Sequence, residues 1–71
     1  MVNTNKLKAA IAKNGLTQRA VAEKLLLSTQ SLNAKINNKT EFTVAEAYKL
    51  CGVLKIKQAE MVEIFFAKKL D

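Results

Sequence analysis

Apolar residues recur three and four positions apart along most of the chain, which is the spacing of a helix with one buried face. Polar residues able to cap a helix N-terminus, Thr17, Ser28 and Thr43, stand just before three of these stretches, and Glu46 completes a capping box with Thr43. Gly15 suits the end of the first. The pattern predicts five helices, over residues 4–14, 18–25, 29–37, 44–54 and 58–69. With no Pro and two Gly, we expect an all-α fold in one domain, residues 1–71.

The last predicted helix carries more large apolar side chains than one helical face can bury. We expect Met61, Val62 and Phe65 to close the core. The surplus side chains would then be exposed and would form an oligomer or partner interface; they are Ile64, Phe66 and Leu70. The alternative is that this helix only closes the core.

The composition argues against catalytic, metal and membrane functions. The chain has no His and a single Cys, and its carboxylates are not clustered, so we expect no metal site, no cofactor and no enzyme activity. Cys51 falls within an apolar pattern, which predicts a buried thiol in a reducing compartment. No apolar run approaches the roughly 20 residues that span a bilayer, and no signal-peptide core follows the first residues. We therefore expect a cytoplasmic protein.

The net charge of +6 is unevenly distributed. Residues 1–39 hold seven basic residues and one acidic residue, whereas residues 40–71 hold five of each. The first half therefore carries the whole excess, which indicates a polyanionic partner for that half.

Two short predicted helices are joined by a three-residue turn between residues 17 and 39. Ala22 is small enough to let the two helices cross closely. The apolar residues that would fill the angle between them are Leu25, Leu27, Leu32 and Ile36. This arrangement is typical of a helix-turn-helix.

The sequence of this unit resembles the helix-turn-helix of the Cro and repressor family, also called XRE-type regulators. The matching residues are Thr17-Gln18, Ala22, Leu25, Ser28, Leu32 and Asn37-Asn38-Lys39. The following segment, KTEFTVAEAYKLCGVLKI, resembles its counterpart in short regulators of temperate phages. The resemblance implies a compact five-helix lambda-repressor-like fold that binds double-stranded DNA in a lysis–lysogeny type genetic switch.

The helix over 29–37 is rich in amides and has no acidic residue. If Leu32 and Ile36 face the core, the opposite face and its edges carry Thr29, Gln30, Asn33 and Ala34. Gln and Asn can pair with adenine through two hydrogen bonds, and the Ala methyl suits the thymine methyl. We predict that these four residues contact bases; the alternative is a merely solvated polar face.

The resemblance also implies contacts to DNA phosphates. It assigns them to Gln18, at the start of the helix over 18–25, and to the loop residues Asn37, Asn38 and Lys39. Arg19 and Lys13 are either further phosphate contacts or solvated surface charges.

Two positions depart from the family pattern. Leu26 stands where the family often has Gly in a left-handed conformation. Lys35 stands where an apolar residue is usual, and we expect Ile36 to take over that packing while the Lys35 stem lies along the surface.

Three functions are compatible with these patterns. The first is a regulator that occupies operator DNA, as a homodimer where the operator has two-fold symmetry. The second is an antirepressor, or modulator of repression, that acts by binding the phage repressor protein. The third is an antitoxin with the same fold.

Overall fold

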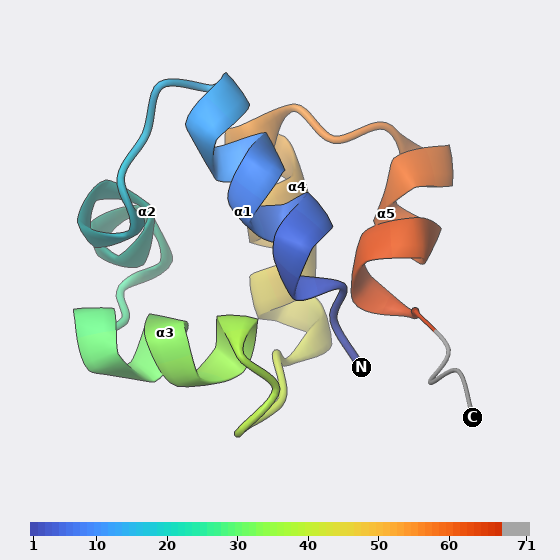
Figure 1. Ribbon diagram of the computed structural model, residues 1–71. Helices are drawn as coiled ribbons and strands as arrows, with labels where there is room; N and C mark the ends of the chain where they lie inside the picture. The colour runs from blue at the N-terminus through green and yellow to red at the C-terminus, as the bar shows by residue number, and fades with distance from the viewer. Residues whose placement is uncertain (68–71) are drawn as a thin grey trace.

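The computed structural model describes residues 1–67 and folds them into five helices (Figure 1). The helices are α1 (Thr4–Lys13), α2 (Gln18–Leu25), α3 (Thr29–Ile36), α4 (Val44–Leu54) and α5 (Gln58–Phe65). The predicted all-α fold is confirmed, and the first four helices end within one residue of their predicted bounds. The fifth was predicted too long: α5 ends at Phe65, and residues 68 and 69 lie outside the described part of the chain.

Polar caps fix where four of the helices begin. Side chains of Asn3, Thr17, Ser28 and Thr43 each accept a hydrogen bond from the backbone N–H three residues later. The predicted Thr43–Glu46 capping box is present in both directions. Such caps are worth about 0.5–2 kcal/mol each, so the helix starts are encoded locally in the sequence.

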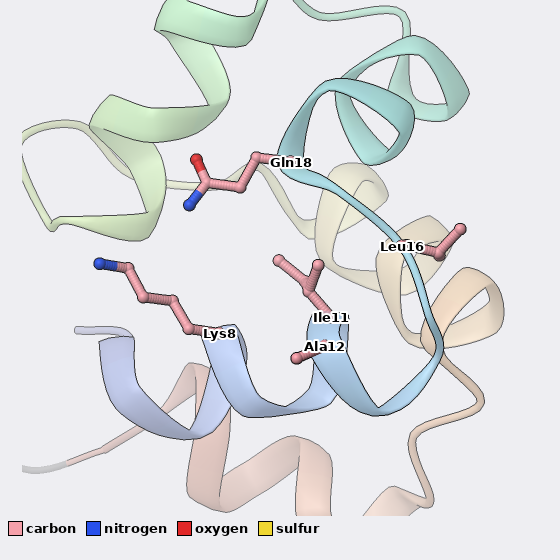
Figure 2. Close-up of a pocket in the computed structure, with 5 residues that line it drawn as sticks. All are labelled: Lys8, Ile11, Ala12, Leu16 and Gln18. Carbon is pink, nitrogen blue, oxygen red and sulfur yellow. The ribbon is translucent and has the colours of Figure 1, made fainter.

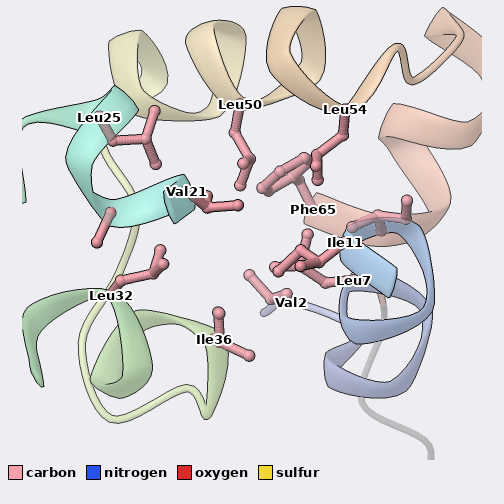
Figure 3. Close-up of a cluster of buried hydrophobic side chains, with 12 residues drawn as sticks. Val2, Leu7, Ile11, Val21, Leu25, Leu32, Ile36, Leu50, Leu54 and Phe65 are labelled. Atoms are coloured by element: carbon pink, nitrogen blue, oxygen red, sulfur yellow. The ribbon is translucent and has the colours of Figure 1, made fainter. Parts of the chain in front are cut away.

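Apolar side chains from all five helices and from Val2 meet in one cluster (Figure 3). In that cluster α2 packs against α3 and α4, and α1 packs against α3 and α5. Leu32 and Ile36 of α3 are completely buried, as predicted. The helix-turn-helix thus rests on a core that the remaining helices complete.

The phase predicted for α5 is wrong. Ile64, predicted to be exposed, is buried, whereas Val62, predicted to lie in the core, is 54% exposed. The face that packs inward is Met61, Ile64 and Phe65, which also has the 3/4 spacing of a helical stripe. Tertiary contacts select it: the Asn3 backbone N–H donates to the Ile64 carbonyl at 2.7 Å. The Phe65 ring meets the Phe42 ring edge-on, with centroids 5.6 Å apart.

The predictions for the other interface and core residues were partly correct. Phe66 is 65% exposed, as predicted, and Leu70 lies outside the described residues. Cys51 is half-buried against the core rather than fully buried, and this burial raises the pKa of its thiol.

The turn between α2 and α3 is left-handed at Leu26, with φ 58° and ψ 36°. Its side chain is 86% exposed, so packing does not compensate for the backbone strain. A bulky residue in this conformation costs about 1–2 kcal/mol.

We predict that Leu26→Gly leaves the free energy of unfolding unchanged or raises it by up to about 1 kcal/mol. The relieved strain outweighs or balances the roughly 0.5–1 kcal/mol of added unfolded-state entropy. Chemical denaturation measures this. Gly15→Ala is the matched reverse change. It should destabilise because Gly15 has φ 68°, where a Cβ is strained, and the space that the added Cβ would occupy is open, so no clash contributes. Marked destabilisation by Leu26→Gly would contradict the assignment of strain.

Candidate nucleic-acid interface

The outward face of α3 holds the residues predicted to contact bases. Thr29, Gln30 and Asn33 are exposed, and Ala34 is half-buried. Together with Lys39 they line a shallow hollow of about 410 Å³. In Figure 1, α3 lies along one edge of the molecule. The four residues therefore share one accessible surface, which we call the α3 face.

Lys35 fixes the C-terminal half of α3 to the start of α4. Its ammonium Nζ lies 2.9 Å from Glu46 Oε1 and donates to the Glu41 carbonyl at 2.9 Å. The Lys35 side chain is only 12% exposed, so the expectation that its stem lies along the surface is wrong. The side chain turns toward the protein because the Glu41 carbonyl and the Glu46 carboxylate accept from its ammonium. The centroid of the Phe42 ring lies 5.9 Å from Lys35 Nζ.

Glu46 is held as a carboxylate by the same contacts. The Thr43 backbone N–H donates to it at 2.8 Å, and this bond, together with Lys35, keeps its pKa below the usual 4.5 despite opposing desolvation. The cap of α4 and the anchor of α3 therefore share one side chain.

Three side-chain amides connect α3 to the start of α2. Asn33 Nδ2 donates to Gln18 Oε1 at 3.3 Å, and Asn37 Nδ2 donates to Asn33 Oδ1 at 3.2 Å and to the Asn33 carbonyl at 2.9 Å. The donors of Asn37 thus point back into α3. This arrangement opposes the predicted phosphate contact of the Asn37 side chain, because its amide N–H groups already have acceptors.

Asn38 is occupied in a different way. Its Oδ1 accepts from the Val2 backbone N–H at 2.7 Å, and its Nδ2 donates to the Val2 carbonyl at 2.9 Å. These bonds tie the N-terminal segment to the loop after α3, and they oppose the predicted phosphate contact of the Asn38 side chain because they occupy its amide. Lys39, the third loop residue, is exposed beside the α3 face.

Lys8 is a candidate contact that the sequence patterns missed. Figure 2 shows Lys8 of α1 and Gln18 of α2 reaching into one hollow of about 270 Å³. The available signal was helical spacing. Lys8 stands three and four residues before Ile11 and Ala12, so it lies on the same side of α1 as these two residues, which line the same hollow. Arg19 is exposed and only loosely paired with Glu23 at 3.8 Å, whereas Lys13 lines a hollow with α5 residues instead.

A helix-turn-helix family model matches residues 7–60, which is 54 of the 71 residues. The chain belongs to the helix-turn-helix family. The resemblance to XRE-type regulators is thereby confirmed, and the family is one of DNA-binding transcriptional regulators, typically without enzyme activity. No curated protein matches the chain.

The described part of this helix-turn-helix chain shows neither a metal-ligand cluster nor a membrane span. Within residues 1–67, no three His, Cys, Asp or Glu side chains gather as metal ligands would. None of the described helices has the length and apolar character needed to cross a membrane.

We predict that Glu46→Gln lowers the free energy of unfolding by about 1.5–3 kcal/mol, the range for hydrogen bonds to charged groups. Because the folded-state pKa of Glu46 lies below its unfolded value of 4.5, its stabilisation is complete above pH 4.5 and is lost as the pH falls through the folded-state pKa. Denaturant titrations across this range should show that the variant lacks this part of the acid sensitivity. The exposed Glu60 provides the control, Glu60→Gln, with little expected change. Equal effects of the two changes would refute the anchoring role.

Proposed function

We propose that this protein is a sequence-specific DNA-binding regulator that inserts α3 into the major groove. The observation that carries the proposal is the α3 face, which is accessible, free of acidic residues and bordered by Lys39. Leu32 and Ile36 are buried on the opposite side of the helix, so the face is held in a fixed orientation. A helix presented in this way matches how helix-turn-helix proteins read bases.

Base recognition centres on Gln30 in this proposal. Its exposed amide can donate to and accept from the major-groove edge of adenine, and Thr29 and Ala34 supply methyl groups for thymine. Asn33 is exposed as well, but its amide already bonds to Gln18 and Asn37.

Phosphate contacts come from side chains around the α3 face. Lys8, Gln18 and Arg19 lie on the α1 and α2 side, and Lys39 lies at the other end of α3. Such contacts make binding depend on salt, with a log–log slope of roughly −3 to −4.5 for about 3–5 phosphates.

The biological setting we propose is a phage lysis–lysogeny switch in the cytoplasm of a bacterial host. The resemblance of the segment over 39–56 to short temperate-phage regulators supports it. A divergently transcribed repressor gene beside the coding sequence is the expected genomic context, and a neighbouring toxin gene would favour the antitoxin alternative.

A second candidate function, binding to a repressor protein, is favoured by an apolar groove of about 310 Å³. It lies between the N-terminal segment, the start of α4 and the end of α5, and exposed Met1, Val44 and Phe66 line it. In the DNA-binding function the same groove would receive a second copy of this chain. Among the described residues, Glu41 is the only charged side chain that lines the groove, so two copies can meet there with little repulsion between side chains.

We predict that Gln30→Ala reduces discrimination between an operator and random DNA by about 1–3 kcal/mol, with little change in affinity for random DNA. The operator is selected from a randomised duplex pool with the wild-type protein. Titrations of both DNAs at several salt concentrations give the affinities and the slopes.

Lys39→Ala is the contrasting control, because it should weaken binding to both DNAs similarly and flatten the slope by about one phosphate. Lys55→Ala removes an exposed cation from the far end of α4 and should change neither. A wild-type protein with no DNA affinity even at low salt would refute the DNA-binding proposal and leave the repressor-binding candidate.

We predict that Phe66→Ser keeps the fold, as seen by circular dichroism, and weakens self-association in sedimentation experiments. Burying such a side chain is worth roughly 1.5–3 kcal/mol. Phe65→Ser is the neighbouring control and should unfold the domain, because Phe65 is buried. Loss of binding to the repressor, with no self-association by the wild type, would favour the second candidate. If neither association exists, the groove is not an interface.

A further inference from the structure

The three amides of Gln18, Asn33 and Asn37 form a chain of hydrogen bonds with a single direction. Asn37 donates to Asn33 Oδ1, and Asn33 donates to Gln18 Oε1. The amide oxygens of Asn33 and Gln18 both accept, so the chain ends at Gln18 Nε2, whose N–H groups have no acceptor among the described residues. We call these three residues the amide chain.

The amide chain fixes which end of the Gln18 side chain faces outward. Figure 2 shows the Gln18 nitrogen on the side toward Lys8 and the oxygen turned away from Lys8. A phosphate oxygen accepts hydrogen bonds and never donates, so only the nitrogen end of the amide can bind it. An unconstrained amide could present either end, whereas this one is held with its donor in the hollow shared with Lys8.

Asn33 itself is poorly placed to read a base. Bidentate pairing with adenine requires both the oxygen and the nitrogen of an amide to turn toward the DNA. In Asn33 the oxygen accepts from Asn37 and the nitrogen donates to Gln18. One N–H and one oxygen lone pair of Asn33 remain, but the two bonds fix the orientation of its amide. Among the described residues no side-chain hydrogen bond constrains Gln30 in this way.

We propose that Asn33 is a positioning residue, which orients Gln18 for a DNA phosphate, and that it is not a base contact. This inference rests on the proposed DNA-binding function. Hydrogen bonds in such a chain polarise one another, so the Asn37 and Asn33 donors strengthen the Gln18 donor. Because Asn33 belongs to α3 and Gln18 to α2, their hydrogen bond also fixes the position of the phosphate contact relative to the α3 face.

The test is a double-mutant cycle of Gln18→Ala and Asn33→Ala, measured as affinity for random-sequence duplex DNA. Asn33→Ala should weaken this non-specific binding by about 3–10-fold, the effect of one lost hydrogen bond. In the Gln18→Ala background it should have no further effect, because the residue acts through Gln18. Gln58→Ala is the matched control, since it removes an exposed amide at the start of α5, and it should leave non-specific binding unchanged.

A second measurement is independent of DNA. In nitrogen–proton spectra of the free protein, Asn33→Ala should shift the side-chain amide signal of Gln18 and leave that of Gln30 in place. Because all three substituted side chains are at least partly exposed and lie outside the core, thermal melts should stay near wild type.

Two results would overturn the inference. If Asn33→Ala affects only the selected operator, and adds to Gln18→Ala, then Asn33 reads a base and the proposed function stands without the amide chain. If the wild-type protein binds no DNA, both the proposed function and this inference fail.

Discussion

An eight-residue helix is too short to be stable by itself, so α3 depends on the contacts that hold it. Complete burial of Leu32 and Ile36 sets which side faces outward. The Lys35–Glu46 pair then fixes its C-terminal half against α4, and the Thr4 hydroxyl donates to the Ile36 carbonyl at 2.7 Å. The α3 face is accessible and oriented only because these contacts occupy the other sides of the helix.

The contacts that hold α3 also determine which basic side chains near it remain unpaired among the described residues. Lys35, although it belongs to the basic half, is paired with Glu46 from the other half at a partly buried position. The cations left in solvent near α3, such as Lys8 and Lys39, can therefore act on a partner rather than on the fold. Exposed positive charge around a helix without acids both attracts DNA and favours acidic over basic partners at the same surface.

The parts of the fold that the sequence predicted correctly are those encoded within a few residues. The caps Thr17, Ser28 and Thr43 and the apolar spacing gave the starts of three helices, and the family pattern identified Leu26 as the left-handed turn. The phase of α5 could not be derived in this way, because both Val62 and Ile64 fit a stripe with Met61 and Phe65. The uses of Lys35, Asn38 and the amide chain were missed because each depends on a partner 11–36 residues away.

The two candidate functions use surfaces that adjoin without sharing lining residues. The apolar groove includes Asn38 and Thr40, and the hollow of the α3 face includes Lys39 between them. A partner confined to the groove, such as a second copy, leaves Lys39 free for phosphate and adds a second α3. A larger partner that extends past Thr40 covers Lys39 and competes with DNA. The groove is therefore compatible with both candidate functions, and the size of a partner bound there would decide between cooperation with DNA binding and antagonism of it.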